Sequence, residues 1–265
     1  MSAILLTIDP QIDFCDPNGA LFVQGADKDI KRLSKMVVEN LHQIAMVNVT
    51  IDSHHYVHIA HPVWWVDEKG NHPDPFTGIA VEDVEGGKYR AYNSKMQDWS
   101  LDYVKILRDN SRYVLTVWPP HCLIGHNGSL IVPEFRNAIL EWEKKFKRVN
   151  YVPKGSCIYT EHYSAVRADV EYPGDPTTTL NMQFINMLKT GHDILIAGEA
   201  LDFCVANTIS DIAEEFSEDE VKKFVLLEDA CSSVNIPGLE NLGPDFVSKM
   251  TAKGMRISTT DKYFK

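Results

Sequence analysis

The sequence has few basic residues and no long apolar run, and both shortages exclude classes of protein. Its 265 residues include 26 Lys and Arg against 37 Asp and Glu, which gives a formal net charge of −11. Because this charge repels phosphate backbones and anionic head groups, we expect no nucleic acid partner and no membrane partner. No stretch approaches the roughly 20 apolar residues of a membrane span, and the opening MSAILLTIDP carries no basic leader. We therefore expect a cytoplasmic protein.

Paired cysteine motifs, internal repeats and low-complexity tracts are also missing. An odd number of widely spaced cysteines without a C-x-x-C pair predicts neither a disulfide framework nor a zinc knuckle. Each is expected to be a free thiol: Cys15, Cys122, Cys157, Cys204 and Cys231. With 44% apolar residues the chain can bury a full core, so we expect one domain over residues 1–265.

Short apolar runs, each followed by an acidic or glycine-containing turn, are present at 3–8, 47–51, 194–197 and 224–227. Such runs are typical of parallel strands that are covered on both faces. Amphipathic helical patterns alternate with them, at 30–44, 135–145, 178–190 and 205–216. The alternation predicts an α/β fold, a doubly wound and mostly parallel sheet with helices on both faces.

Ligands of such sheets bind beyond the carboxyl ends of the strands, where Asp9, Asp52 and the turn at Gly198 are expected to lie. Lys154 follows a further short apolar stretch and is expected at the same edge. Residues 56–110 break the alternation, because they are rich in His, Pro, Trp, Gly and Asp without sustained periodicity. We expect them to form a long loop excursion with at most short elements.

A histidine cluster follows the second predicted strand. Asp52 and His54 lie two residues apart at its end, so both side chains can face one ion. Further histidines are His55, His58 and His61 nearby, and His121 far along the chain. The alternative interpretation is a polar loop with solvated histidines, and the spacing alone leaves both open.

Two cysteines are candidate nucleophiles. Cys204 lies where a predicted helix begins, so the helix N-terminus would favour a thiolate and backbone N–H groups could hold an oxyanion. Cys122 adjoins His121 but is followed by apolar residues, which is more typical of packing. Cys204 could equally be a small buried residue. A nucleophilic thiol needs a proton acceptor, and Asp9 and Lys154 share its sheet edge, although one could cap a turn and the other be solvated.

Five segments match a known family in order: DPQIDF (9–14), DSH (52–54), WPPHC (118–122), PKG (153–155) and GEALDFCV (198–205). Over about residues 4–231 the chain resembles the isochorismatase-like cysteine hydrolases and, within them, the metal-containing nicotinamidase (pyrazinamidase) branch. The resemblance implies the isochorismatase-like hydrolase fold and a homo-oligomer. It also implies an enzyme of NAD salvage that hydrolyses nicotinamide to nicotinate and ammonia through a cysteine thioester.

The resemblance assigns roles to the motif residues. Three match the family's catalytic triad: Asp9, Lys154 and Cys204. Three match its ligands for one divalent transition metal: Asp52, His54 and His121. Zn²⁺ is the first choice, and Fe²⁺ or Mn²⁺ would also suit such a site. On this interpretation Cys122 has no chemical role.

The resemblance also covers the substrate pocket. Phe14 and Trp118 match the aromatic walls that hold a pyridine ring. The N–H groups of Ala200 and Cys204 would form the oxyanion hole, beside a cis peptide bond between Glu199 and Ala200.

Three positions depart from the family pattern, namely Ser53, His55 and Leu201. Many nicotinamidases have a D-W-H-P run and a Thr before the aspartate of the cysteine motif. The triad is intact, but the substrate could differ. The alternatives are a related metal-assisted amidase for another small amide, and a non-catalytic metabolite-binding member of the fold.

Overall fold

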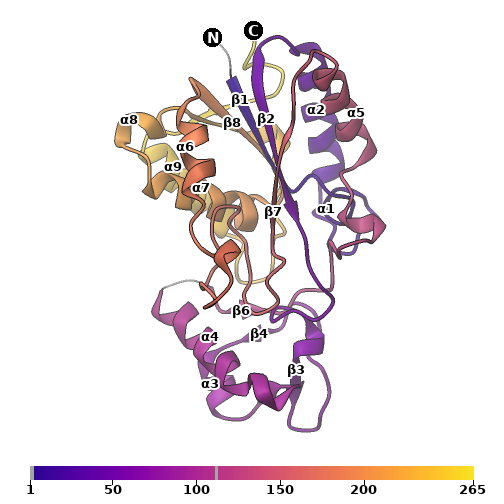
Figure 1. Ribbon diagram of the computed structural model, residues 1–265, viewed down its shortest axis with the longest axis vertical. Coiled ribbons are helices and arrows are strands. Elements are labelled where there is room, and N and C mark those ends of the chain that lie inside the picture. Colours follow the sequence, from indigo (N-terminus) through magenta and orange to yellow (C-terminus); the bar gives the residue numbers. More distant parts are fainter. Residues whose placement is uncertain (1–2, 111–112) are drawn as a thin grey trace.

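A six-stranded parallel sheet forms the centre of the computed structural model, which describes residues 3–110 and 113–265 (Figure 1). The strand order is β10-β9-β8-β1-β2-β7, and every neighbouring pair is parallel. The strands are β1 (Ala3–Ile8), β2 (Ile44–Asp52), β7 (Asn150–Lys154), β8 (Asp193–Gly198), β9 (Phe224–Leu227) and β10 (Arg256–Ser258). Strands β1 and β8 are buried throughout, which explains their nearly unbroken apolar sequences.

Helices cover both faces of this sheet (Figure 1). One face carries α2 (Ala26–Glu39) and α5 (Pro133–Glu143), and the other carries α6 (Met182–Lys189), α7 (Ala206–Glu214) and α9 (Leu242–Ala252). Two short helices are α1 (Ile12–Cys15) and α8 (Glu218–Val221). The arrangement confirms the predicted doubly wound α/β fold. Among the described helices, none is long and apolar enough to cross a membrane.

The helix predicted over 30–44 is wrong at both ends. It begins at Ala26, and it ends at Glu39 because a turn at 40–43 leads into β2, whose first residue Ile44 is fully buried. Leu41 and Ile44 continue the apolar spacing of the helix along the sequence, which explains the prediction, but they lie outside the helix in the structure. Helix α9 and strand β10 were not predicted, since β10 has two exposed residues out of three and therefore lacks an apolar run.

The segment after β2 forms a small lobe beyond the carboxyl edge of the sheet (Figure 1). Its elements are β3 (Trp65–Asp67), β4 (Gly78–Ile79), α3 (Val81–Glu85), β5 (Tyr89–Ala91), α4 (Gln97–Asp109) and β6 (Leu115–Thr116). The expectation of at most short elements in 56–110 is wrong for α4, which has 13 residues. Its buried residues, Ser100, Tyr103, Val104 and Leu107, have the spacing of an amphipathic helix, so the pattern was present but was hidden by the irregular sequence around it.

Candidate active site and metal centre

Asp9, Lys154 and Cys204 come from three elements and meet at the carboxyl edge of the sheet. Asp9 directly follows β1, Lys154 ends β7, and Cys204 lies in a single π-helical turn (Leu201–Val205) that runs into α7. Lys154 Nζ lies 3.1 Å from Asp9 Oδ2 and 3.5 Å from Cys204 Sγ. All three side chains are buried. The three residues singled out in the sequence therefore form one cluster.

Lys154 is the centre of this cluster. Its ammonium group also lies 3.0 Å from Asp52 Oδ1 and donates to the His162 carbonyl at 2.9 Å. Burial opposes its charge, but the Asp52 and Asp9 carboxylates outweigh burial and raise the pKa of Lys154 well above its usual range. Lys154 is therefore a fixed buried cation.

The environment makes Cys204 a thiol at rest and Asp9 a base. Burial raises the pKa of the Cys204 thiol well above its usual range, and the charge of Lys154 offsets this only in part. Burial also raises the pKa of Asp9, despite the nearby ammonium group. A carboxylate with a raised pKa accepts a proton more readily. Thr50 donates its hydroxyl proton to Asp9 Oδ1, which leaves Oδ2 on the Lys154 side.

Asp52, His54 and His121 also meet. Asp52 Oδ2 lies 3.0 Å from His54 Nε2 and 3.3 Å from His121 Nε2, and all three residues are buried. Their potential ligand atoms lie within 4.8 Å of one another, as binding of a single ion requires. His121 Nδ1 lies 2.8 Å from the Pro119 carbonyl, the backbone contact that commonly orients a metal-binding imidazole.

The charge state of Asp52 also suits a metal ligand. Burial alone would raise the pKa of Asp52, but His54 and Lys154 lower it well below its usual range. A ligating carboxylate must be ionised, so this donor set of one carboxylate and two imidazoles fits the divalent transition metal that the resemblance implies.

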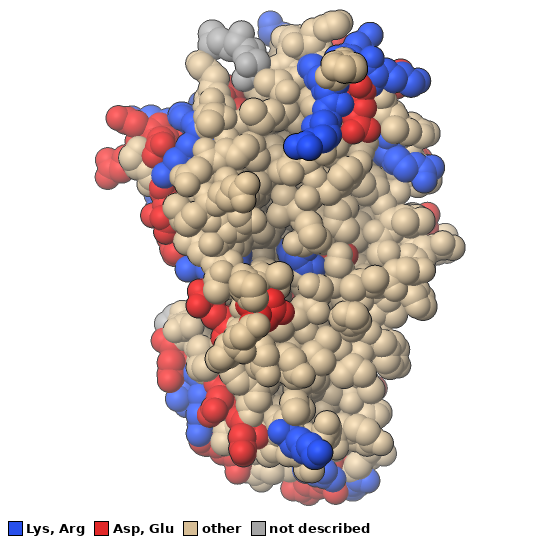
Figure 2. All heavy atoms as spheres, in the orientation of Figure 1, with Lys and Arg blue, Asp and Glu red and all other residues tan. Residues whose placement is uncertain are grey.

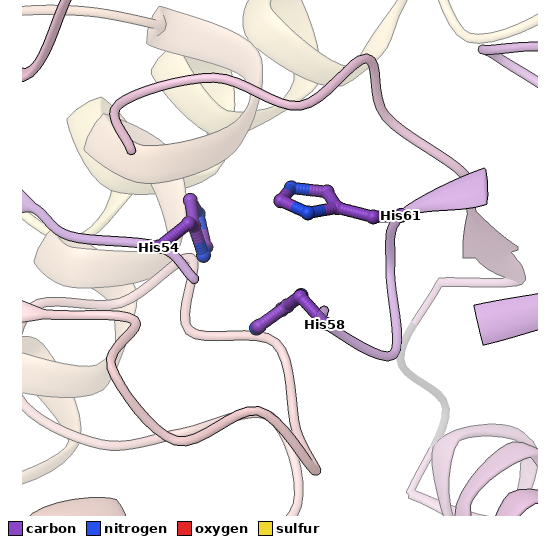
Figure 3. A group of neighbouring side chains, drawn as sticks. All are labelled: His54, His58 and His61. Carbon is purple, nitrogen blue, oxygen red and sulfur yellow. The ribbon is translucent and has the colours of Figure 1, made fainter. Parts of the chain in front are cut away.

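Two further imidazoles, those of His58 and His61, adjoin His54. The three rings face one another across a short gap, and their ligand atoms lie within 4.8 Å (Figure 3). Burial, and to a lesser extent the charge of His54, lowers the pKa of His61 to about 3 and that of His58 well below its usual range. Both rings therefore stay neutral. His55, in contrast, is exposed. The structure thus separates His55 from the histidine cluster.

A small cavity opens onto the thiol. Its lining residues are Phe14, Leu21, Asp52, Trp118, His121, Lys154, Glu161, Tyr163, Ala200, Phe203, Cys204 and Val234. The set includes both aromatic residues that match the family's ring walls, and two of the three candidate metal ligands. The peptide bond between Glu199 and Ala200 is cis. None of the three departures from the family pattern lines the cavity.

Two residues of the DPQIDF motif hold the site together in ways that sequence reasoning missed. The Gln11 amide group accepts from the backbone N–H of Asp52 at 2.8 Å and donates to its carbonyl at 2.7 Å. The Asp13 carboxylate accepts from the backbone N–H of Cys122 at 2.7 Å. Because these bonds join the start of α1 to the end of β2 and to the WPPHC segment, the motif positions the candidate metal ligands. The DPQIDF motif as a whole was the feature of the sequence from which a role for Gln11 and Asp13 could have been predicted.

Glu161 and Tyr163 were also missed. Both line the cavity, and the Tyr163 hydroxyl accepts from the Trp118 indole N–H at 2.8 Å. They lie in an irregular segment after β7, where no periodicity marks them. Cys122, by contrast, is fully buried and does not line the cavity. Burial raises the pKa of its thiol well above the usual range, which agrees with a packing role.

Solved structures of nicotinamidases and pyrazinamidases resemble this structure along its whole length. The yeast nicotinamidase bound to the inhibitor nicotinaldehyde has a TM-score of 0.66 at 18% identity, covering 97% of this chain and 99% of the other. An Acinetobacter baumanii nicotinamidase/pyrazinamidase has a TM-score of 0.63 at 21% identity, covering 98% and 97%.

The pyrazinamidase of Pyrococcus horikoshii in complex with zinc has a TM-score of 0.56 at 19% identity, covering 98% of this chain and 99% of the other. No protein-family profile and no curated protein matches the sequence. At these identities the likeness establishes the fold. The chain therefore has the isochorismatase-like α/β fold of the nicotinamidases and pyrazinamidases.

Proposed function

We propose that the protein is a nicotinamidase, which hydrolyses nicotinamide to nicotinate and ammonia in NAD salvage. The observation that carries the proposal is the contact of Lys154 with both Asp9 and Cys204, beside a cavity that Asp52 and His121 also line. Known structures of the same fold include a nicotinamidase with nicotinaldehyde bound and a pyrazinamidase with zinc. A cytoplasmic homo-oligomer, with each chain a single domain, is part of the same proposal.

The first half of the reaction forms a thioester. Asp9 takes the proton of the Cys204 thiol, and the adjacent Lys154 ammonium stabilises the negative charge as it moves to sulfur. The thiolate attacks the carboxamide carbon, and the N–H groups of Ala200 and Cys204 hold the resulting oxyanion. Asp9 then gives its proton to the amide nitrogen, the C–N bond breaks and ammonia leaves.

The second half releases the acid. Asp9 takes a proton from water while the water oxygen attacks the thioester carbon. The C–S bond breaks, and Asp9 returns the proton to the Cys204 sulfur. The net change is amide plus water to carboxylic acid plus ammonia, and the protein returns to its starting state.

The remaining cavity residues would orient the ring. Asp52, His54 and His121 would hold one divalent ion, for which we propose Zn²⁺, and such an ion offers an open position to a pyridine nitrogen when bound. Phe14 and Trp118 would stack against the ring faces. The Trp118 plane is held by the hydrogen bond to Tyr163 and by edge contact with Phe203, whose ring centroid lies 5.1 Å away.

A related amidase for another small amide is the second candidate, because the sequence departs from the family pattern at Ser53, His55 and Leu201. Since none of them lines the cavity, they give no reason for a reshaped pocket. The contacts of Lys154 with both Asp9 and Cys204 argue against a non-catalytic binding protein.

Ammonia release from nicotinamide by the zinc-loaded protein tests the proposal. We expect Cys204→Ala to lower kcat/KM by at least about a thousandfold, because the covalent nucleophile is lost. Cys122→Ala is the matched control and should keep most of the activity. A zinc-loaded wild-type protein that leaves nicotinamide intact would refute the proposal, and an active Cys204→Ala would refute the assigned nucleophile.

A further inference from the structure

Four imidazoles form one continuous buried cluster beside the substrate cavity. The His54 ring lies centrally, with centroid distances of 4.5 Å to His58, 5.3 Å to His61 and 4.8 Å to His121. His54 consequently belongs to two groups that could hold a metal ion. The cavity group is Asp52, His54 and His121, and the rear group is His54, His58 and His61 (Figure 3).

The rear group contains polar atoms without partners among the described residues. They are His54 Nδ1, His58 Nε2, His61 Nε2 and, beside them, Glu161 Oε2. Buried polar atoms are rarely left unpaired, and those without a protein partner commonly bind an ion or an ordered water. Glu161 Oε1 lies 3.8 Å from His54 Nε2, and Glu161 Oε2 lies 4.0 Å from His58 Nδ1. A fourth donor is therefore close at hand.

His61 is oriented as a metal ligand. Its Nδ1 lies 3.1 Å from the Tyr56 carbonyl, which can only accept, so Nδ1 carries the proton and Nε2 has a free lone pair. His121 has the same arrangement on the Pro119 carbonyl. A neutral imidazole anchored in this way through its other nitrogen is the usual state of a metal-binding histidine. The two rings thus offer equivalent ligands beside His54, and their own centroids lie 5.8 Å apart.

Charge limits the cluster to one ion at a time. The buried groups around it are the carboxylates of Asp9, Asp52 and Glu161 and the ammonium group of Lys154, with formal charges that sum to −2. One divalent cation neutralises this sum, whereas a second would leave two positive charges without compensation in the interior. Both groups also include His54, and a neutral imidazole has one free nitrogen lone pair, so its ring binds one ion at a time.

We infer that the ion has two positions, one in the cavity group and one in the rear group. Asp52 and His121 line the cavity, but His54, His58 and His61 do not. An ion in the cavity group can meet a substrate, whereas an ion in the rear group is withdrawn from it. Three imidazoles suit zinc and iron, so the rear group would retain the same metal. This inference concerns metal retention and does not depend on the reaction.

Metal content per chain, measured after loading with Zn²⁺ and gel filtration, tests the inference. We expect about one ion in the wild type, in His121→Ala and in His61→Ala, since each single variant keeps one complete group. The double variant, which combines His61→Ala with His121→Ala, has neither complete group and should lose most of its zinc. His55→Ala, a change at the exposed neighbour, is the matched control and should bind as the wild type does.

Each contrary result overturns the inference in a different way. Two ions in the wild type would mean two independent sites. A metal-free His121→Ala would leave the cavity group as the only site, and a metal-free His61→Ala would make His61 an obligatory ligand of a single site. A double variant that keeps its zinc would exclude both groups. If the double alanine variant does not fold, the double glutamine variant answers the same question.

Cobalt substitution supplies a second readout that hydrolysis does not influence. Co²⁺ in His121→Ala would have three imidazole ligands from the rear group, whereas Co²⁺ in His61→Ala would have two, with the Asp52 carboxylate as the third ligand. We expect the visible absorption spectra of the two to differ, because ligand type changes the ligand field. Identical spectra would overturn the inference. Since neither measurement uses substrate, failure of the proposed nicotinamidase activity would leave the result interpretable.

Discussion

Glu199 shows how one buried residue outside the triad can control stability. It is 1% exposed, and its Oε2 accepts from the backbone N–H of Ser232 at 3.0 Å. The Ser232 hydroxyl donates to Asp29, which is itself buried. Burial, followed by the charge of Asp29, raises the pKa of Glu199 well above its ordinary value. The folded protein therefore keeps a proton on Glu199 that the unfolded chain gives up.

We expect Glu199→Gln to reduce the loss of stability that accompanies a rise in pH above about 5. The contribution of the bound proton is complete below the ordinary pKa of 4.5 and declines as pH rises toward the folded-state pKa. For one proton the slope is at most about 1.4 kcal/mol per pH unit. Glutamine keeps an acceptor for Ser232 and does not titrate.

Urea unfolding of both proteins between about pH 5 and pH 8 gives the two slopes. The wild type should lose more stability over this interval than Glu199→Gln. Glu68→Gln, a change at an exposed carboxylate, is the control and should follow the wild type. Equal slopes for all three proteins would show that Glu199 does not hold the proton.

At the scale of elements, strand order assembles the charged part of the site. Strands β1, β2 and β7 are neighbours, and Asp52 on β2 pairs in register with Lys154 on β7. Asp9 follows β1 at the same edge. The parallel direction brings all three strand ends together, so the Lys154 contacts follow from register. A shift of one residue in β7 would turn Lys154 to the other face of the sheet.

We expect Gly198→Ala to disrupt this edge. Gly198 ends β8 with a φ of +109°, and a Cβ at this position would collide with the backbone of Ile8 on β1. Gly70 also has a positive φ, +87°, but has no neighbour within 4 Å of a built Cβ. Alanine at Gly70 should therefore cost only the backbone strain of about 1–2 kcal/mol.

Alanine at Gly198 adds the collision, so we expect a loss of at least about 3 kcal/mol or failure to fold. Urea unfolding measures both variants at one pH. Equal losses would show that β1 and β8 adjust to the extra methyl group without cost.

At the scale of the whole molecule, charge is unevenly distributed. On the face in Figure 2, acidic side chains gather over α8, whose first turn contains Glu218, Asp219 and Glu220, and over the lobe. The net charge of −11 exerts no net Coulomb force on a neutral amide but repels an anionic product. The electrostatic field of the protein therefore repels the proposed product, nicotinate, but not the proposed substrate, nicotinamide.

Substrate selection also belongs to the whole molecule, because the cavity combines α1, the segment after β6, the ends of β2 and β7, and the turn before α7. We expect nicotinamide and pyrazinamide to be cleaved, and benzamide to be cleaved at least roughly a hundredfold more slowly. Benzamide keeps the ring and the amide but has no nitrogen lone pair for the ion. When benzamide binds, a water molecule can keep the open position on the ion, and this limits the loss of kcat/KM.

Values of kcat/KM for nicotinamide and benzamide, with and without zinc, measure this selectivity. The difference between the two substrates should shrink when the ion is removed. Equal values in the zinc-loaded protein would show that the ion does not orient the ring.

The sequence by itself determined the central strands and the order of the motifs. A strand covered on both faces must be apolar along its length, so β1, β8 and β9 could be located directly from composition. Strand β10 is mostly exposed and carries no such signal, and the amphipathic spacing of α4 lies within a region whose Gly, Pro and His content obscured it. The resemblance supplied the candidate roles, which local physics had left open for Asp9 and Lys154.

Only the tertiary structure separated chemically identical residues. Cys204 lines the cavity and Cys122 does not, and His61 is buried against His54 whereas His55 is exposed. Lys154 meets Asp52 across 102 positions of sequence and Cys204 across 50. Such contacts depend on strand order, register and the packing of irregular segments. These features are determined by the free energy of the whole chain. Local periodicity describes single elements, so it cannot specify which distant side chains become neighbours.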